Sequence, residues 1–518
     1  MNMTISEHLH KNRIGFQTSG GDLVIWCPFC EKTDVTGSRL LTFHIKPETG
    51  NGQCQMCLKR CEFENLAEKL HIKIRRPRPE PEETPEAKLE PVRPPVNTSQ
   101  FKPLTSQELI SILGLTIKKD EENKLITFLC ELSAFTEGSQ FNISFNAPSS
   151  TGKSYIPTEI ARLFPEEDVV EIGYCSPTAF FHDIGQYQKD KGGYLVDLSR
   201  KILIFLDQPH TQLLERLRPL LSHDKKEIRL KITDKTQKFG LKTKTVLLRG
   251  YPSVIFCTAG LKIDEQEATR FLLLSPETNQ EKIREAIHER IKKEADNDSY
   301  KAWLNQNPER ELLKDRILAV KQADIQEIKI GSPEKIEEWF FSKNKMLKPR
   351  HSRDIGRLIS IIKSFALLNL WFREKGQDGL TIIANDSDID EAFKIWEIIS
   401  ESQELNLPPY IFNLYREVIL SAWNDKNNNR SEGFQEITGE LGISRQEISQ
   451  KHYQVYGRFI ADWQLRQQII PMLETAGLVS QEADPSDKRK MLIYPTTQLN
   501  ISEVKNNSES EGGVKIES

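Results

Sequence analysis

The sequence predicts a multidomain α/β protein, and three observations carry this prediction. The chain has 518 residues, more than one hydrophobic core supports, and this length is typical of about three domains. Two pairs of cysteines stand near the start and flank a strand-like segment. In the middle, an apolar strand, a turn of small residues and an amphipathic helix follow one another within residues 141–165, which is the order of a β–α unit.

Charge and hydropathy narrow the class of protein. Lys and Arg number 71 against 75 Asp and Glu, so the net charge of -4 gives no general case for nucleic-acid binding, and any such case must be local. No run of eighteen apolar residues occurs, and the start of the sequence lacks the apolar region of a secretory signal. We therefore expect a soluble, cytoplasmic protein with no membrane partner.

The first module is predicted from its cysteines. The pairs Cys27, Cys30 and Cys54, Cys57 are separated by 23 residues that include the strand-like run "RLLTFHI". Zn²⁺ prefers four soft ligands at tetrahedral angles, and two facing CxxC turns supply them. In a reducing compartment such pairs favour a metal over disulfides. Four unrelated buried thiols remain the alternative, and Cys61 and His44 rank below the pairs as ligands.

A resemblance adds to this prediction. The stretch "CPFCEKT" followed by "LLTFHIKPETGNGQCQMC" resembles the zinc-binding domain of bacterial replicative primases, over about the first 70 residues. That family usually has histidine where this sequence has Cys30, which zinc tolerates. The resemblance implies contact with single-stranded template DNA. A zinc ribbon that only holds its own fold or docks on a partner stays open.

The next segment predicts a tether. Residues 75–97 combine frequent proline with charge and almost no apolar residues, so they are expected to be extended and to let the zinc module move independently. Short helices follow, with Thr105 or Ser106 as a cap.

The central segment "QFNISFNAPSSTGKSYIPTEIARLF" predicts a phosphate-binding loop between a strand and a helix. Backbone amides would hold the phosphates of ATP, Lys153 would reach the β and γ oxygens, and Ser154 would hold Mg²⁺. Only Gly152 must lie next to a phosphate, so Ala147 at the first position costs little. The predicted loop residues are Ala147, Pro148, Ser149, Ser150, Thr151, Gly152, Lys153 and Ser154.

A second strand supports this site. The run "RKILIFLDQPH" is an apolar strand ending in Asp207, the expected partner on the Mg²⁺ side. Gln208 stands where this class usually has a catalytic glutamate. Glutamine can orient a water but cannot take its proton. Hydrolysis is therefore slow, or another carboxylate is the base, or positioning suffices.

Residues about 140–400 resemble AAA+ ATPases and, in detail, minichromosome-maintenance and superfamily-three helicases. The strand "YPSVIFCTAG" ends at Thr258, "EATRFLLLSPE" contains Arg270, and amphipathic helices with Arg353 follow. The resemblance implies that Thr258 is a sensor beside the γ-phosphate, that Arg270 is a finger offered to the neighbouring subunit, and that Arg353 is a second sensor in a helical lid. A plain surface arginine is the alternative for Arg270. The acidic "NDSDID" is interpreted as a helix cap.

A basic hairpin is predicted between the Asp207 and Thr258 strands. Apolar residues alternate from Ile228 to Ile232, a polar turn follows, and Thr243 to Leu248 form a returning strand. Residues 225–249 contain nine Lys or Arg and two acids, a local charge of +7. The helicases that this segment resembles insert a hairpin here that projects into a ring's channel. A solvated ribbon is the alternative. The candidate DNA-binding residues are Lys231, Lys235, Lys238, Lys242 and Lys244.

The C-terminal part predicts a winged helix. The run "EGFQEITGELGISRQEISQ" has a helix-turn-helix pattern with Ser444 as a cap, and a long helix and two strand-like runs follow. Lys488, Arg489 and Lys490 lie in the turn between these runs and are candidates for phosphate contacts. Winged helices also bind proteins, so both roles stay open.

Together these patterns predict a zinc ribbon, an AAA+ α/β domain with a helical lid, and a winged helix. The expected boundaries are 1–74 for the zinc module, 75–103 for the linker, 104–275 for the ATPase core, 276–400 for the lid, 401–498 for the winged helix and 499–518 for a disordered tail.

The first functional hypothesis is a ring-forming ATP-dependent DNA helicase or translocase for replication. Primer synthesis by this chain alone is discounted, because no polymerase-like catalytic domain has room between residues 75 and 140 and the sequence offers no catalytic carboxylate cluster, but a separate primase is a possible partner. The second is a non-motor, ATP-gated DNA-binding switch such as an initiator, loader or mobile-element regulator, which Gln208 favours. A nucleotide-dependent scaffold that binds only proteins is the third.

Overall fold

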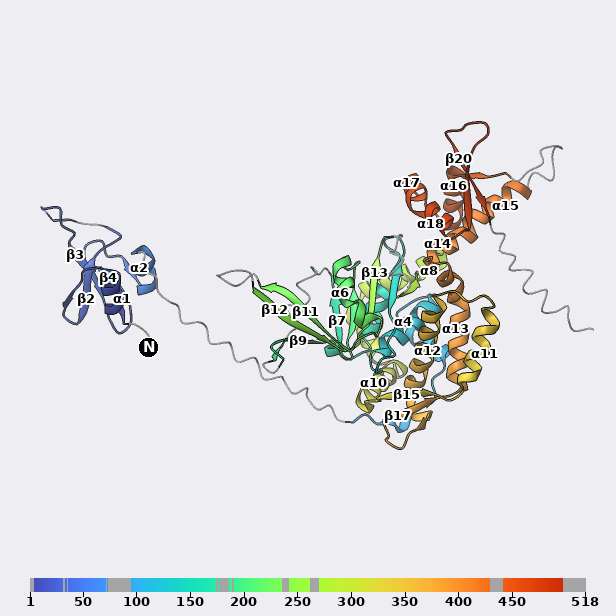
Figure 1. Ribbon diagram of the computed structural model, residues 1–518, viewed down its shortest axis with the longest axis horizontal. Coiled ribbons are helices and arrows are strands. Elements are labelled where there is room, and N and C mark those ends of the chain that lie inside the picture. Colours follow the sequence, from blue (N-terminus) through green and yellow to red (C-terminus); the bar gives the residue numbers. More distant parts are fainter. Residues whose placement is uncertain are drawn as a thin grey trace, which may run out of the picture. The chain divides into compact units, whose positions relative to one another are not determined.

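The computed structural model describes residues 4–30, 33–34, 36–70, 72, 95–173, 176, 186–188, 191–234, 242–260, 270–428 and 441–496. The chain divides into two compact units, Met1–Pro94 and Pro95–Ser518 (Figure 1). The predicted multidomain α/β organisation is confirmed to this extent: an antiparallel sheet with a cysteine cluster comes first, and a parallel sheet and helical segments follow. The candidates Lys235 and Lys238 lie outside the described residues, as do residues 75–94 of the predicted linker and the tail after residue 496.

The first unit is one antiparallel sheet with two helices. Its strands pair in sequence order because each connection returns the chain beside the strand it has just left. Ile25, Phe43 and Ile45 are fully buried together with Leu9 and Leu66 of the helices. The elements are α1 (Ile5–Lys11), β1 (Gln17–Ser19), β2 (Asp22–Trp26), β3 (Leu41–Ile45), β4 (Gly52–Cys54), β5 (Arg60–Cys61) and α2 (Phe63–Lys69).

The second unit is built on a five-stranded parallel sheet of order β14-β6-β13-β10-β7. Four of its strands, β6, β10, β13 and β14, are buried along their whole length, as expected of strands covered on both faces. Since β13 lies between β6 and β10, the carboxyl ends of these three strands meet at one edge. The strands are β6 (Ile143–Asn146), β7 (Val169–Ile172), β10 (Ile202–Phe205), β13 (Ser253–Thr258) and β14 (Leu272–Leu274).

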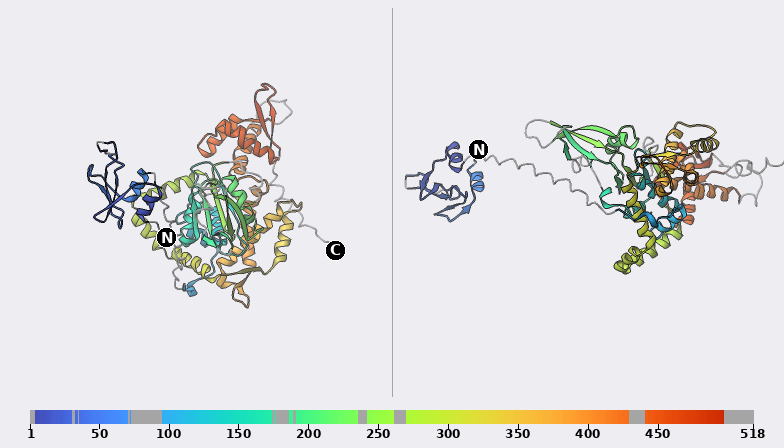
Figure 2. Two further views of the ribbon diagram at one scale, coloured as in Figure 1. Left: turned by 60° about the vertical axis from the view of Figure 1, so that its left-hand side comes forward. Right: turned by 90° about the horizontal axis from the view of Figure 1, so that it is seen from below.

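A second sheet contains the predicted hairpin. β11 (Glu227–Asp234) and β12 (Lys242–Arg249) pair antiparallel over eight residues each, so the hairpin is confirmed. β12 also pairs parallel with β9 (Gly193–Asp197), which pairs with β8 (Gln186–Gln188), a second hairpin that the sequence reading missed. This sheet extends away from the parallel sheet (Figures 1 and 2). Leucines of α6 (Thr211–Leu221) share a core with residues of both sheets.

Helices before and after the strands of the parallel sheet share its hydrophobic core. Eleven of the thirteen residues of α4 are buried, and one cluster joins α4 and β6 to α10, α12 and α13. The predicted caps are confirmed: Thr105 caps α3 and Asn385 caps α13, each with a capping box. The helices are α3 (Ser106–Leu113), α4 (Glu121–Ser133), α5 (Tyr155–Ala161), α8 (Gln280–Ala295), α9 (Asn297–Asn305), α10 (Pro308–Ala323), α11 (Pro333–Lys343), α12 (His351–Leu368) and α13 (Asp386–Glu404), with the short η1 (Thr98–Gln100), η2 (Glu166–Asp168) and η4 (Leu370–Phe372).

The segment predicted as a purely helical lid also contains strands. β15 (Glu327–Ile330), β17 (Thr381–Ala384) and β16 (Glu374–Lys375) form a small sheet beside α12. The run Thr381–Ala384 is rich in β-branched residues and follows Gly379, whose φ of +70° ends the preceding turn. The β-branched run after this turn therefore forms a strand where a helix was predicted.

The last described part of the chain has helices followed by the two predicted strands, β19 and β20. These two strands pair antiparallel with each other, and β18 pairs antiparallel with β20 at one edge of the sheet. Ser444 caps α16 with a capping box, as predicted, whereas the first helix of the predicted helix-turn-helix falls in residues 429–440, outside the described residues. The elements are α14 (Pro409–Leu414), the π-helical η5 (Tyr415–Leu420), α15 (Ser421–Asn428), β18 (Ile443–Ser444), α16 (Arg445–Tyr456), α17 (Asp462–Gln464), the π-helical η6 (Leu465–Ile469), α18 (Ile470–Thr475), β19 (Val479–Ala483) and β20 (Met491–Pro495).

Replacing Gln403 by leucine tests how the edge of the parallel sheet is held. The buried Gln403 amide accepts from the Leu273 N–H at 3.1 Å and donates to the Leu273 carbonyl at 2.7 Å. Gln403→Leu leaves both backbone groups of β14 without a partner, which costs about 1–3 kcal/mol for each group. We expect a lower thermal midpoint by circular dichroism. Gln326→Leu, the same change at an exposed site, is the control, and equal midpoints for the two variants would contradict this account.

Candidate functional site

The loop of residues 147–154 connects β6 to α5 in the order that the sequence predicts. Ala147 is fully buried, and its N–H donates to the Thr258 carbonyl at 3.4 Å, so the start of the loop is tied to β13. Ser150 and Gly152 have φ values of +65° and +93°, the left-handed region. A Cβ on Gly152 meets nothing within 4 Å in this chain, so the backbone conformation is what favours glycine there.

Lys153 and Ser154 end the loop. The Lys153 ammonium donates to the Pro148 carbonyl at 2.7 Å, across the loop. Burial lowers the pKa of Lys153, and the nearby Asp207 carboxylate opposes that shift, which links the loop to β10 electrostatically. Ser154 is exposed at the start of α5, and its hydroxyl makes no capping hydrogen bond. The hydroxyl is thus available as an oxygen ligand.

Three polar residues, Asp207, Gln208 and Thr258, stand at the carboxyl ends of β10 and β13, beside the loop after β6. The Thr258 hydroxyl donates to the Gln208 side-chain oxygen at 3.1 Å and accepts from the Gly260 N–H at 2.9 Å. The Gln208 N–H donates to the Asp207 carboxylate at 2.7 Å. Because the Gln208 side-chain oxygen accepts from Thr258, the Gln208 side-chain nitrogen remains as a donor. The arrangement can bind a cation at Asp207 and orient a polar group at Gln208.

A buried ion pair between Lys282 and Asp120 contacts the 147–154 loop, and the sequence analysis did not predict it. The Lys282 ammonium, at the start of α8, pairs with Asp120 and also donates to the Glu277 carbonyl at 3.0 Å and to the Thr151 carbonyl at 3.4 Å. Asp120 is fully buried and has a left-handed backbone, with φ of +56°. Lys282 is 131 residues from Thr151, so no local pattern announces the contact.

The two candidate arginines lie in different parts of the second unit. Arg270 lies away from the end of β6 that carries the loop, and Arg353 lies at the start of a helix. Arg270 precedes β14, where Leu272 pairs with Ile143 at the amino end of β6, whereas the loop begins at the opposite end of β6. Its side chain donates to the Ser222 hydroxyl at 3.2 Å. The structure therefore does not bring Arg270 to its own chain's loop. Arg353 is exposed in the first turn of α12.

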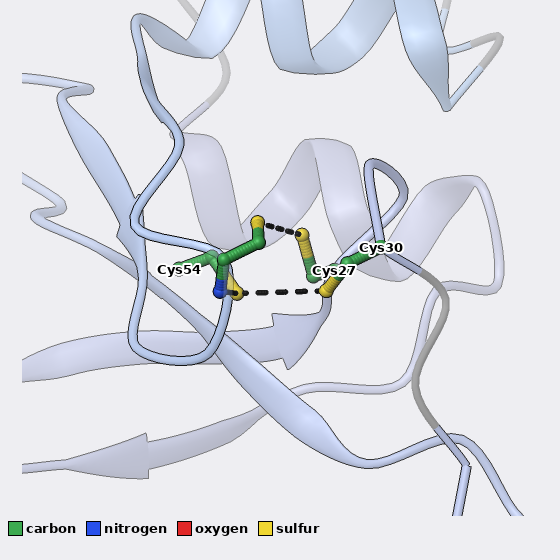
Figure 3. Close-up of side chains that lie close together, drawn as sticks. Cys27, Cys30 and Cys54 are labelled. Carbon is green, nitrogen blue, oxygen red and sulfur yellow. Dashed lines mark hydrogen bonds between the residues drawn. The ribbon is translucent and has the colours of Figure 1, made fainter.

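The four predicted zinc ligands are brought together. The sulfur atoms of Cys27, Cys30, Cys54 and Cys57 all lie within 4.8 Å of one another (Figure 3 labels three of them). Cys27 and Cys57 are 3.8 Å apart, as are Cys30 and Cys54. A tetrahedral Zn²⁺ with Zn–S bonds of about 2.3 Å separates its sulfurs by about 3.8 Å, so the cluster fits zinc.

The surroundings of the cluster shift the pKa values of two of its cysteines in opposite directions. Burial raises the pKa of Cys27 to about 12. Burial also opposes ionisation of Cys54, but backbone N–H groups of Cys57 and Met56 donate to its sulfur at 3.4 and 3.3 Å, and the net effect lowers its pKa to about 6. The spare candidates lie outside the cluster, since His44 stands 3.6 Å from Asp22 and Cys61 is a separate half-buried thiol.

The hairpin sheet combines basic and aromatic side chains. Lys231 is exposed on β11, and the Lys244 ammonium of β12 lies 4.9 Å from the centre of the Tyr194 ring. Tyr187 meets Tyr194 edge to face at 5.2 Å and is 55% exposed. Lys242 begins β12 opposite Asp234. Sequence reasoning missed the tyrosines because they come from the second hairpin, about fifty residues away.

The predicted wing turn is basic but partly compensated. Lys488, Arg489 and Lys490 are exposed between β19 and β20, and the Arg489 side chain is 93% exposed. Asp487 lies 3.2 Å from the Arg489 guanidinium and 3.8 Å from the Lys490 ammonium. The net positive charge of this turn is therefore smaller than the three bases alone suggest.

Among the helices that the structure describes, none is long and apolar enough to cross a membrane. No protein-family model and no curated protein sequence matches this chain. Among solved structures, the chain is similar to a full-length MCM homolog from Methanopyrus kandleri, with 13% sequence identity and a TM-score of 0.36. The match covers 60% of this chain and 64% of that chain, less than two thirds of its length. Fold and function therefore rest on this chain's own residues.

Metal analysis of the purified chain tests the cysteine cluster. We expect about one Zn²⁺ per chain, because all four sulfurs lie within 4.8 Å of one another and two pairs already stand 3.8 Å apart, the spacing of a tetrahedral zinc site. Cys54→Ser replaces one soft ligand and should lose the metal, whereas Cys61→Ser, outside the cluster, should keep it. Inductively coupled plasma mass spectrometry after gel filtration measures both. Full zinc content in Cys54→Ser would show that the cluster is not the site.

Proposed function

We propose that this chain is an AAA+ ATPase that acts on DNA as a helicase or translocase in replication. The observation that carries the proposal is the meeting of the 147–154 loop with Asp207, Gln208 and Thr258 at one edge of the parallel sheet. Two independent strands therefore present a cation-binding carboxylate and a polar pair beside a loop with left-handed turns and a lysine. This combination suits a nucleoside triphosphate with its metal.

In this proposal each residue of the site has a stated task. Backbone N–H groups of residues 147–154 hold the phosphates, Lys153 reaches the β and γ oxygens, and Ser154 and Asp207 hold Mg²⁺. The metal, when bound, neutralises charge on the phosphates. Gln208 orients the attacking water, and Thr258 fixes Gln208 by its hydrogen bond. Because glutamine takes no proton, hydrolysis depends on positioning.

The two arginines extend the site to a ring in this proposal. Arg270 serves the nucleotide of a neighbouring subunit, an assignment supported by its position at the end of β6 opposite to its own loop. Arg353 acts in its own chain as the second sensor of the helical lid. ATP then lies between subunits of a homo-oligomeric ring.

DNA contacts are proposed for three parts of the chain. On the hairpin sheet, lysines track phosphates while Tyr187 and Tyr194 offer faces on which bases stack, a combination suited to single strands. The lysines are Lys231, Lys235, Lys238, Lys242 and Lys244. Lys488, Arg489 and Lys490 contact phosphates from the wing, and the zinc module contacts template DNA and cooperates with a separate primase.

A second candidate function is favoured by one residue. Gln208 in place of a carboxylate suits slow hydrolysis, and slow hydrolysis suits an ATP-gated DNA-binding switch, such as an initiator, loader or mobile-element regulator, better than a motor. The basic, tyrosine-bearing hairpin sheet favours the motor.

Steady-state ATP hydrolysis with and without single-stranded DNA separates these functions. For a motor we expect DNA to raise turnover severalfold, and Lys153→Ala to abolish it because the β and γ oxygens lose their cation. Lys301→Ala, an exposed lysine on α9, is the matched control. If the unaltered chain binds ATP but hydrolyses it with DNA no faster than Lys153→Ala does, the result would support the switch and rule out the motor.

Exchanging Gln208 for glutamate tests its role directly. A carboxylate at this position can accept the proton of the attacking water, so Gln208→Glu should raise the single-turnover rate about tenfold or more. Gln208→Ala loses the orienting group and should lower the rate. An unchanged rate in both variants would mean that Gln208 lies outside the reaction.

Salt-dependent binding of oligo-dT tests the hairpin sheet. Neutralising two phosphate contacts in Lys231→Gln/Lys244→Gln should reduce the slope of log affinity against log salt by about 1.4, because each contact with a single strand contributes about 0.7. Fluorescence anisotropy at several salt concentrations measures the slope. Lys301→Gln/Lys329→Gln is the control, since both lysines are exposed outside this sheet. Identical slopes for the two pairs would contradict a phosphate track here.

A further inference from the structure

The winged-helix part of the chain exposes three large aromatic rings. Tyr453 of α16, Phe459 in the turn that follows it and Trp463 of α17 are 50%, 65% and 53% exposed. Within the described residues 401–428 and 441–496, no leucine, isoleucine or methionine is exposed to a comparable degree. The large apolar surface that this part of the chain offers to a ligand is therefore aromatic.

A stacked pair of rings forms one end of this surface. The centres of the Tyr453 and Phe459 rings are 4.5 Å apart, and their planes meet at only 13°. Each ring covers one face of the other, and half or more of each residue is still open to solvent. The helices α16 and α17 on either side of the turn pack against each other (Figure 1). A further flat ring can extend such a stack.

Two contacts carry the chain from the stacked pair to Trp463. The Ser449 hydroxyl donates to the Ile460 carbonyl at 3.1 Å, and the Arg445 guanidinium pairs with Asp462 at 2.7 Å. Ser449 and Arg445 lie about one and two turns before the stacked pair, on the same face of α16. Trp463 follows Asp462 directly, so it lies beside α16 about 12 Å from the stacked pair, at a rise of about 1.5 Å per helical residue.

The charge around the rings is positive. Residues 445–466 contain four Lys or Arg and two acids, a local charge of +2 in a chain of net charge -4. Arg458 and Arg466 pair with no carboxylate among the described residues. Arg458 directly precedes Phe459, and Arg466 is exposed three residues after Trp463, on the helix that continues from α17 into η6. The rings therefore have two arginines beside them that no described acid neutralises.

The residue types of this surface favour nucleic acid over protein as its ligand. A protein interface combines aliphatic with aromatic side chains, whereas unpaired bases need the flat faces of rings and their phosphates need cations. Gln454 and Gln467 are exposed in the same segments, and amide side chains match the hydrogen-bonding edges of bases. Paired bases in a duplex are already stacked on one another, so the expected ligand is a single strand.

We infer that the turn between α16 and α17 binds single-stranded DNA by stacking unpaired bases on Tyr453, Phe459 and Trp463, with Arg458 and Arg466 on the phosphates. The rings and arginines together are the "ring surface". This site rests on the proposed action on DNA and deepens it, because the proposal gives this part of the chain only phosphate contacts from the wing. The nucleotide site takes no part in the argument.

Photo-crosslinking of the full chain tests where unpaired bases lie. Oligo-dT that carries 5-iodouracil crosslinks on irradiation to aromatic side chains stacked on that base, and mass spectrometry of the digested complex locates them. We expect crosslinks within residues 453–463. Crosslinks confined to other parts of the chain, such as the hairpin sheet, would overturn the inference and leave the proposed action on DNA intact. If the unaltered chain binds no oligo-dT, the inference and the proposed function both fail.

Affinities of two double variants test whether the ring faces themselves bind. Phe459→Leu/Trp463→Leu keeps apolar side chains and removes two rings, so it should bind oligo-dT at least about fivefold more weakly for each base that loses its stacking partner. Phe341→Leu/Trp303→Leu makes the same changes at exposed rings on α11 and α9 and is the matched control, which should bind as the unaltered chain does. Fluorescence anisotropy measures both.

An abasic oligonucleotide of the same length separates base stacking from phosphate contact. It offers phosphates without bases, so the unaltered chain and both double variants should bind it equally. Weaker binding of the abasic strand by Phe459→Leu/Trp463→Leu would overturn the inference, because the rings would then act through the fold or the phosphates. Unchanged affinity of this variant for oligo-dT would also overturn it, and would leave a protein as the ligand of the ring surface.

Discussion

The parallel pairing of β13 between β6 and β10 is the constraint on which the second unit depends. Parallel neighbours place their carboxyl ends at one edge, so the loop after β6, Asp207 after β10 and Thr258 at the end of β13 must meet. The Thr258 hydroxyl and carbonyl then connect Gln208 on one side to Ala147 on the other. A change of strand order would separate these groups even if every local element were kept.

The core beneath this edge couples it to the rest of the unit. α4 is buried almost entirely, and the hydrophobic cluster around it includes both the parallel sheet and the helices α10, α12 and α13. The Asp120 carboxylate, at the start of α4, holds Lys282 against the loop. The loop, the start of α8 and the start of α4 are therefore connected by direct contacts.

The cysteine cluster and the hairpin sheet depend on different parts of the fold. The cysteine cluster is held by two short turns and needs nothing from the second unit. The hairpin sheet needs two insertions that meet only because β12 pairs with β9.

Much of this protein could be predicted from the sequence where the determinants are local. CxxC spacing indicated the cysteine cluster, the strand–turn–helix pattern indicated the 147–154 loop, and alternation indicated β11 and β12. The small sheet in the lid, the second hairpin with its tyrosines and the Lys282–Asp120 support were not predicted. Hydrophobic periodicity and ligand spacing depend on neighbours along the chain, so the sequence alone determined those elements. Strand order and buried ion pairs depend on contacts between residues far apart along the chain, which only the tertiary structure decided.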